Sequence, residues 1–252
     1  MVYRVFGRQQ HRSIRKEKYS RERAVLRREM SFCIAIDGPA GAGKSTIAKM
    51  IAKEMNLIYV DTGAMYRAMA YYLLTQNTNL DDAEDISSKC KGADIKIIYE
   101  KGEQVVILNG ENVNPYLRTE EVGKMASVSS TNGTVRAKLV ELQQKMAEDT
   151  DLIMDGRDIG TCVLPNAPLK IYLTASSRVR ALRRYDELCA KGEKCDLDVI
   201  EADIIERDYR DMNRDISPLK QAEDAVLVDT SDMTILEVVD KIITLAKEVR
   251  RN

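Results

Sequence analysis

The sequence predicts an α/β protein whose parallel sheet is covered by helices on both sides. Apolar runs typical of buried strands recur along the 252 residues, at Phe32–Ile36, Leu57–Val60, Leu152–Met154, Leu169–Leu173 and Ala225–Val228. Segments with the 3.6-residue period of amphipathic helices lie between or after these runs. Strands that alternate with helices favour a parallel sheet with both faces buried.

Two of the helical segments carry continuous apolar stripes. Apolar residues share one helical face at Ala48, Ile51, Ala52 and Met55, and again near the end of the chain at Ile235, Val238, Val239, Ile242, Ile243 and Ala246. Stripes of this width are the core-facing sides of helices. We interpret both as packing against the sheet.

Two segments interrupt the alternation of strands and helices. In residues 94–113, Lys101 and Gly102 lie between two β-rich runs, which predicts a hairpin outside the main sheet. Residues 186–217 are highly charged, "KGEKCD" breaks a helix within them, and Pro218 follows. We expect this second segment to be an exposed helical arm.

Charge is distributed unevenly along the chain. The formal net charge is −1, but residues 1–29 carry ten Lys or Arg against three Asp or Glu. We interpret residues 1–30 as a basic, disordered extension, with Met30 as a candidate natural start, and residues 31–252 as one domain. Two other hypotheses stay open for the extension. An Arg-rich targeting peptide is disfavoured by its glutamates, and a nucleic-acid-binding arm is favoured by its charge density alone.

Composition excludes several kinds of chemistry from the domain. The only histidine, His11, lies in the extension, so Ser-His-Asp triads and histidine-ligated metals are excluded from the rest of the chain. Five cysteines without a C-x-x-C pair favour free thiols in a reducing compartment over a zinc site. No apolar run is long enough to span a membrane.

The segment "GPAGAGKS" matches the phosphate-binding pattern G-x-x-x-x-G-K-[ST] at Gly38, Gly43, Lys44 and Ser45. A predicted strand precedes it and a predicted helix follows it, which is the context that the pattern requires. Glycines let the backbone amides turn toward an anion, and the helix adds its positive end. We predict a nucleoside triphosphate here, with Lys44 on the β- and γ-phosphates. We expect Ser45 to ligate Mg²⁺, with Thr46 as a second candidate; the alternative is a glycine-rich turn without a ligand.

The segment "VDTGAMYR" ends the second predicted strand and opens a helix. Asp61 and Thr62 are candidate caps, and Tyr66 and Arg67 fall in the first turns. An arginine fork at the end of a strand suits a phosphate group. A plain surface pair of Tyr66 and Arg67 is the alternative.

The segment "IMDGRDIGT" follows another buried strand. Asp155 closes that strand and is a candidate Mg²⁺ ligand through water. Arg157 and Asp158 follow at the carboxyl end of the sheet, where open α/β sheets bind their ligands. A structural Gly-Arg-Asp turn is the alternative.

The segment "ERDYRDMNR" places Arg207, Arg210, Asp211 and Arg214 at i, i+3, i+4 and i+7, which predicts one helical face. Because acidic residues lie close by, a solvated face of ion pairs is one interpretation. The other is a lid that closes its arginines onto a transferring phosphoryl group. The absence of histidine agrees with phosphoryl transfer, which depends on positioning and charge neutralisation.

Together, "IDGPAGAGKST", "DTGAMYR", "LRTEEV…AS", "DGRDIGT" and "ERDYRDMNR" resemble bacterial-type cytidylate kinases in order and spacing, from Ser31 to the C-terminus. The resemblance implies a P-loop NTPase fold of the nucleoside monophosphate kinase type, with a five-stranded parallel sheet flanked by helices. It also implies an acceptor-binding insert at about 62–145, containing a small antiparallel sheet, and a helical lid at about 186–217. The expected reaction is Mg²⁺-dependent transfer of the γ-phosphoryl group of ATP to CMP or dCMP, in a cytoplasmic monomer.

Residue roles follow from the resemblance position by position. It implies that ATP is bound by Gly38, Pro39, Ala40, Gly41, Ala42, Gly43, Lys44, Ser45 and Thr46. It implies that CMP is bound by Thr62, Tyr66, Arg67, Ser127, Arg136, Arg157, Asp158, Asp211 and Arg214. The implied catalytic cations are Lys44, Arg157, Arg207, Arg210 and Arg214, and the implied metal-site residues are Ser45 and Asp155. Within the CMP set, Ser127, Arg136 and Asp158 would recognise the cytosine edge, while Arg67, Arg157 and Arg214 would hold the acceptor phosphate.

Two rival functions stay open on the sequence alone. A P-loop kinase of another nucleotide or small metabolite would keep the loop and change the acceptor. A nucleotide-gated nucleic-acid-binding protein would use the basic extension.

Overall fold

A computed structural model describes residues 31–251 of the chain. The basic extension and His11 lie outside these residues, so the hypotheses about them stay predictions. Five parallel strands form the main sheet in the order β2-β6-β1-β7-β8. Their bounds are β1 Cys33–Asp37, β2 Ile58–Asp61, β6 Leu152–Gly156, β7 Leu169–Thr174 and β8 Val226–Asp229. The predicted α/β class and its five-stranded parallel sheet are confirmed.

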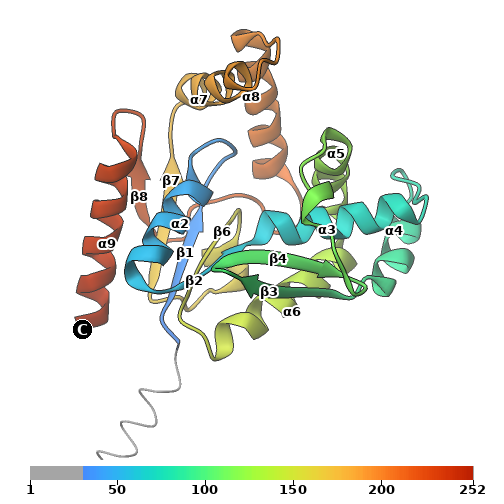
Figure 1. Cartoon of the computed structure of the whole chain (residues 1–252), viewed down its shortest axis with the longest axis horizontal. Coiled ribbons are helices and arrows are strands. Elements are labelled where there is room, and N and C mark those ends of the chain that lie inside the picture. Colours follow the sequence, from blue (N-terminus) through green and yellow to red (C-terminus); the bar gives the residue numbers. More distant parts are fainter. Residues whose placement is uncertain (1–30, 252) are drawn as a thin grey trace, which may run out of the picture.

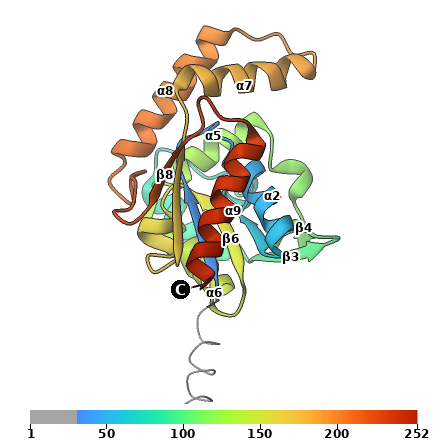
Figure 2. The ribbon, with the colours of Figure 1, turned by 90° about the vertical axis from the view of Figure 1, so that its left-hand side faces the viewer.

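Helices bury both faces of this sheet (Figure 1, Figure 2). Side chains of β1 alternate, so that Cys33 and Ala35 join one buried cluster while Ile34 and Ile36 join the other. The second cluster includes apolar residues of α2 (Lys44–Met55) and α9 (Ile235–Arg251), the two helices with predicted stripes. The cluster on the opposite face, which contains Cys33 and Ala35, includes residues of α3 (Thr62–Thr75), α5 (Glu120–Ser129) and α6 (Gly133–Glu148).

A small antiparallel sheet lies beside α3, outside the main sheet (Figure 1). It contains β3 (Ile95–Glu100), β4 (Glu103–Leu108) and a short β5 (Glu111–Asn112). Lys101 and Gly102 both have positive φ, as a tight hairpin turn requires, so the predicted hairpin is confirmed. The strand β5 was not predicted, because two polar residues have no recognisable pattern.

Gln104 on β4 fastens this hairpin to the edge strand of the main sheet. Its amide oxygen accepts from the backbone N–H of Asp61 at 2.8 Å, and its amide nitrogen donates to the carbonyl of Asp61 at 3.2 Å. Tyr99 donates to the carbonyl of Tyr59 at 3.1 Å. Side chains of the hairpin therefore hydrogen-bond to backbone N–H and carbonyl groups at the open edge of β2.

Shorter elements complete the region between β2 and β6. They are α4 (Ala83–Lys89) and the 3₁₀ turns η1 (Cys90–Gly92) and η2 (Asn114–Tyr116). Asn132 caps α6 through the N–H groups of Thr134 and Val135, and its amide also donates to the carbonyl of Ala83. This contact joins α6 to the start of α4.

Two helices, α7 (Ser177–Ala190) and α8 (Leu197–Asn213), form a hairpin beyond the carboxyl ends of the strands (Figure 1). The helical hairpin begins before the expected residue 186, because α7 follows directly from β7. Gly192 has a positive φ in the turn, and Asp196 caps α8. The turn brings the sulfur atoms of Cys189 and Cys195 to 3.7 Å.

Residues 31–251 contain no helix that is both long enough and apolar enough to cross a membrane.

Candidate active site

The loop after β1 needs glycine for steric reasons. Gly38 has φ +148°, and a Cβ at this position would lie 1.9 Å from the carbonyl oxygen of Leu173 in β7. Gly43 has φ +86° and immediately precedes Lys44, the first residue of α2. The strand, the loop and the helix therefore have the arrangement that the phosphate-binding pattern predicts.

Lys44 folds back over this loop. Its ammonium donates to the carbonyl of Pro39 at 2.7 Å, and the residue is only 6% exposed. Burial lowers the pKa of Lys44, and the nearby Arg157 lowers it further. A buried cation beside a second cation favours the arrival of an anion at this point.

Asp155, near the end of β6, lies next to Ser45 at the start of α2. Ser45 donates to one carboxylate oxygen of Asp155 at 3.0 Å, and Tyr59 donates to the other at 2.8 Å. Burial raises the pKa of Asp155, and the charge of Asp61 adds to that rise. Because Mg²⁺ prefers oxygen ligands and takes few of them from the protein in nucleotide sites, this hydroxyl and carboxylate fit the ion. No cluster of three or more His, Cys, Asp or Glu able to hold a metal exists in the described chain.

Asp37 connects the phosphate loop to the segment that follows β6. This segment contains Arg157 and Asp158 and then forms a short π-helical turn, η3 (Ile159–Val163). The carboxylate of Asp37 accepts the N–H groups of Ile159 and Gly160, both at 2.7 Å. Burial raises the pKa of Asp37 to about 6, although these two N–H groups oppose the rise.

Asp158 is the centre of a buried polar cluster at the carboxyl edge of the sheet. It forms a buried ion pair with Arg136 of α6, and Arg214 approaches its other oxygen at 3.6 Å. The guanidinium of Arg136 lies 5.7 Å from the ring centre of Tyr66. The hydroxyl of Tyr66 and one terminal nitrogen of Arg214 are buried without hydrogen-bond partners. Unsatisfied buried groups beside an ion pair indicate a place for a polar ligand.

Arg157 connects this cluster to the helical hairpin. Its Nε donates to the carboxylate of Asp211 in α8 at 2.8 Å. Burial raises the pKa of Asp211, but the Arg157 charge and hydrogen bond lower it more, so the net pKa is below its usual range. Thr62 donates to the backbone carbonyl of Asp155 at 2.7 Å, whereas Asp61 caps α3 by accepting from the N–H of Ala64. Of the two candidate caps, therefore, only Asp61 has that role.

The helical face expected for four residues of α8 is correct for three of them. Arg207, Arg210 and Asp211 lie within the helix, but α8 ends at Asn213. Arg214 is the next residue, has extended backbone angles and donates to the carbonyl of Ser217 at 2.6 Å. The prediction that Arg214 continues the helical face is wrong, because the chain leaves the helix to bring this side chain to Asp158.

The two remaining lid arginines have different surroundings. Arg207 is exposed at the surface of α8, but partial desolvation of its guanidinium, together with the charge of Arg157, lowers its pKa. Arg210 is exposed and pairs with Glu206 of its own helix at 3.6 Å. Arg207 therefore belongs to the cluster of cations around Arg157, whereas Arg210 forms the solvated pair that was the alternative interpretation.

Comparisons with known proteins agree with this geometry. The family model described as cytidylate kinase matches residues 34–248. The chain belongs to the cytidylate kinase family. A cytidylate kinase of Ligilactobacillus salivarius (strain UCC118) is 50% identical over 215 residues, which cover 85% of this chain and 96% of the relative. A cytidylate kinase of Bacillus subtilis (strain 168) is 44% identical over 223 residues, which cover 88% of this chain and all of the relative.

Membership of the cytidylate kinase family confirms the resemblance that the motifs indicated, and with it the prediction of a nucleoside monophosphate kinase. Of the predicted CMP-binding residues, Tyr66 contacts the cluster through its ring beside Arg136 and not through a hydrogen bond, and two others, Ser127 and Arg67, have no side-chain hydrogen bond to it within residues 31–251. Ser127 is half-buried on α5, and its carbonyl accepts from the hydroxyl of Ser130, whereas its side chain makes no hydrogen bond within residues 31–251. Arg67 is half-buried near the first turn of α3, within 3.2 Å of where a Cβ on Gly63 would lie.

Sequence reasoning missed three residues of this cytidylate kinase site. They are Asp37, which holds η3, Tyr59, which holds Asp155, and Arg180 of α7, which donates to the carbonyl of Ala40 in the phosphate loop. Only Asp37 had a recognisable signal, as a charged residue at the end of an otherwise apolar strand. Tyr59 and Arg180 have ordinary positions in their segments.

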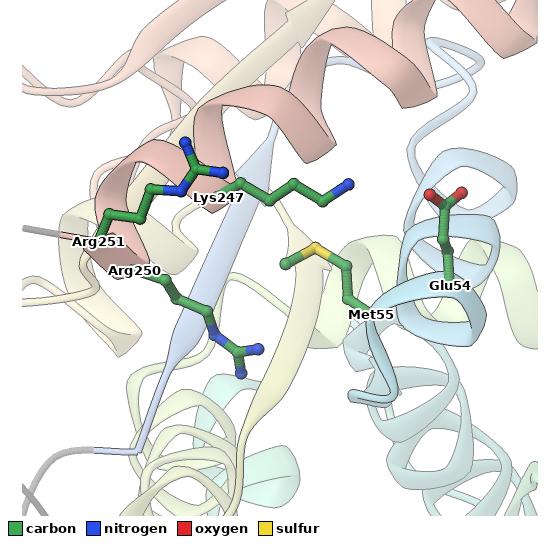
Figure 3. Close-up of a pocket in the computed structure, with 5 residues that line it drawn as sticks. All are labelled: Glu54, Met55, Lys247, Arg250 and Arg251. Carbon is green, nitrogen blue, oxygen red and sulfur yellow. The ribbon is translucent and has the colours of Figure 1, made fainter.

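A pocket elsewhere in the molecule is separate from this site (Figure 3). Glu54, Met55, Lys247, Arg250 and Arg251 line it, at the carboxyl ends of α2 and α9. Arg250 pairs with Asp151, which immediately precedes β6, so the pocket lies at the amino edge of the sheet. Open α/β sheets bind their substrates at the opposite edge.

Proposed function

We propose that this member of the cytidylate kinase family transfers the γ-phosphoryl group of ATP to CMP and dCMP, giving CDP and dCDP. The observation that carries the proposal is the buried cluster of Arg136, Asp158 and Arg214, beside a complete phosphate loop. Cytosine has an N4 amino donor beside its N3 and O2 acceptors. A carboxylate paired with guanidinium groups offers the complementary acceptor and donors.

The donor nucleotide lies along the phosphate loop in this proposal. The loop Gly38–Thr46 holds the triphosphate through the backbone N–H groups of its residues other than Pro39, and Lys44 exchanges the carbonyl of Pro39 for the β- and γ-phosphates. Bound phosphate would raise the pKa of Lys44, which burial and the charge of Arg157 lower, because it places negative charge beside the ammonium group. The side chain is therefore charged when it is needed.

Ser45 and Asp155 are the proposed residues for Mg²⁺, directly or through water. Their 3.0 Å contact and their oxygen donors support this assignment. When bound, the ion neutralises charge on the β- and γ-phosphates. Tyr59 keeps the Asp155 carboxylate oriented through its 2.8 Å hydrogen bond.

The acceptor nucleotide lies with its base against Asp158 and its phosphate toward Arg157. Ser127, Arg136 and Asp158 recognise the cytosine edge in this proposal, and Thr62, Tyr66 and Asp211 surround the base and sugar. Arg67, Arg157 and Arg214 hold the acceptor phosphate. Arg214 approaches Asp158 at 3.6 Å, so in the proposed complex it extends from the base-recognising carboxylate to the phosphate.

The chain's own part in the reaction is positioning and charge neutralisation. An oxygen of the acceptor phosphate attacks the γ-phosphorus in line with the leaving oxygen of ADP. The charge of Arg157 lowers the pKa of both Lys44 and Arg207, so the three cations lie close enough together to share the charge that spreads over the transferring group. We assign Arg210 to the same task when α7 and α8 close over the nucleotides, which would replace its present pairing with Glu206.

We also propose that the enzyme works as a monomer in the cytoplasm. Its cysteines are all free, which suits a reducing compartment. Size-exclusion chromatography with light scattering tests the monomer, because a dimer would double the expected mass.

A coupled assay of ADP formation with CMP, dCMP, UMP and AMP tests the proposal. We expect CMP and dCMP to be preferred over UMP by about 10- to 100-fold in kcat/KM, since uracil places an acceptor where cytosine has its amino group. Equal or faster turnover of UMP or AMP would contradict the assignment of the acceptor.

A further inference from the structure

Arg180, on the first turn of α7, is a buried cation that connects three parts of the molecule. The residue is only 5% exposed. Its Nε donates to the carbonyl of Ala175, directly after β7, and its Nη1 donates to the carbonyl of Ala40 in the phosphate loop, both at 2.9 Å. Its Nη2 pairs with the carboxylate of Asp208 in α8 at 2.7 Å.

The contact with Ala40 matters for the shape of the phosphate loop. A loop whose N–H groups point inward at phosphates must direct its carbonyls outward, and buried carbonyls need partners. Arg180 is the partner of the Ala40 carbonyl, and Lys44 is the partner of the Pro39 carbonyl. A Cβ on Gly41 would lie 3.3 Å from the Cβ of Arg180, so α7 packs closely against this part of the loop.

The contact with Asp208 fixes the orientation of α8. Asp208 directly follows Arg207 in the helix and is itself only 8% exposed. Because neighbouring side chains on a helix have a fixed angular relation, holding Asp208 against α7 sets the direction of Arg207. The proposed function assigns Arg207 to the transferring phosphoryl group, and the nearby charge of Arg157 lowers the pKa of Arg207.

Stability alone does not explain this pair. A buried ion pair is often no more stabilising than apolar side chains of the same volume, although removing one partner is costly. A guanidinium that makes three directed contacts does specify geometry. We propose that Arg180 and Asp208 are positioning residues, which couple the shape of the phosphate loop to the placement of Arg207 over the transferring phosphoryl group. This inference rests on the proposed kinase function.

The two partners should be separable by experiment. Arg180 contacts both the phosphate loop and α8, whereas Asp208, which lies on α8, contacts Arg180 of α7 and no residue of the phosphate loop. We therefore expect Arg180→Lys to weaken ATP·Mg binding and to lower kcat, each by about tenfold or more, the equivalent of about 1.4 kcal/mol. Asp208→Asn should lower kcat by a similar factor and leave ATP affinity within twofold, with KM for CMP little changed in both variants.

Arg178→Lys is the matched control, because Arg178 also joins α7 to α8. It pairs with Asp198 at 2.6 Å and Glu201 at 3.0 Å, but it is half exposed and contacts no residue of the phosphate loop. The ATP affinity and the kcat of the Arg178→Lys variant should stay within twofold of the values for the unmodified chain. The Asp208→Asn change should also cost nothing further in a chain that already has Arg207→Ala, since both act through the same guanidinium.

The test measures ATP·Mg affinity by calorimetry and kcat by steady-state rates with CMP. Both are measured at a temperature well below the unfolding midpoint of each variant. If both variants merely unfold at lower temperature, with ATP affinity and kcat unchanged, the pair is structural and the inference is wrong. Additive losses in the Arg207→Ala, Asp208→Asn chain would also overturn it. If Arg180→Lys does not fold, Asp208→Asn and the double variant still test the coupling to Arg207. An unmodified chain without CMP kinase activity would instead refute the proposed function.

Discussion

Replacing Asp37 by Asn should change how the stability of the protein depends on pH. The carboxylate of Asp37 is buried at the end of β1 and accepts the N–H groups of Ile159 and Gly160. Burial raises its pKa from 3.8 to about 6, and the nearby charge of Asp158 adds to the rise. Asparagine has nearly the same shape and does not titrate, so the substitution isolates the proton at this position.

The sign and size of the effect follow from the two pKa values. Between about pH 4 and pH 6, the folded protein keeps a proton on Asp37 that the unfolded chain has already released. The free energy of unfolding therefore falls as the pH rises through this window. The gap between 3.8 and about 6 corresponds to about 3 kcal/mol in full, of which about 2.5 kcal/mol is lost between pH 4 and pH 7.

Urea unfolding of both proteins at intervals from pH 4 to pH 7 measures this difference. We expect the unmodified protein to lose about 2.5 kcal/mol relative to Asp37→Asn across this range, since the other carboxylates are common to both. Asp232→Asn, at an exposed aspartate, is the control and should give a difference that does not vary with pH. A constant difference for Asp37→Asn, or one that changes in the opposite direction, would refute the reasoning.

Four further substitutions test the site. Gly38→Ala should lower the free energy of unfolding by about 3 kcal/mol, because the added Cβ would overlap the carbonyl of Leu173. Gly43→Ala should lower it by only about 1 kcal/mol, because a Cβ at Gly43 has open space and meets only the cost of a positive φ. Equal effects of the two substitutions in urea unfolding would contradict the steric argument. Lys44→Ala should reduce kcat by about 10²- to 10³-fold, and near-normal turnover would exclude it from catalysis. Asp158→Ala should lower the free energy of unfolding by about 3 kcal/mol, because Arg136 is left unpaired. It should also reduce the preference for CMP over UMP. An unchanged ratio of kcat/KM for the two nucleotides would locate base recognition elsewhere.

Much of the fold could be predicted because its signals are local. Each strand of the main sheet is four to six residues long and mostly apolar, and the helices α2 and α9 have apolar stripes. The hairpin turn at Lys101 and Gly102 needs positive φ at both residues, and glycine there is visible in the sequence. The phosphate loop was equally clear, because its glycines, lysine and serine have fixed spacing.

The contacts that position the site were not predictable, because they join residues far apart in the chain. Asp37 accepts hydrogen bonds from η3, and Tyr59 donates one to Asp155. Arg180 donates to the phosphate loop and pairs with Asp208 of α8. Each of these contacts depends on tertiary packing. Arg214 has helical spacing in the sequence, yet the helix ends before it, since its side chain is engaged by Ser217 and Asp158. Tertiary contacts of this kind override the local pattern.

In the proposed complex, two nucleotides bind end to end at the carboxyl edge of the sheet. This central claim is tested most directly by calorimetric titration with a single compound in which adenosine and cytidine are joined 5′ to 5′ through a pentaphosphate. One molecule should bind per chain, about 100-fold or more tightly than either ATP or CMP, because linking the two ligands makes the second binding event intramolecular. It should also displace both nucleotides. Affinity no better than that of ATP alone, or displacement of only one nucleotide, would contradict the account.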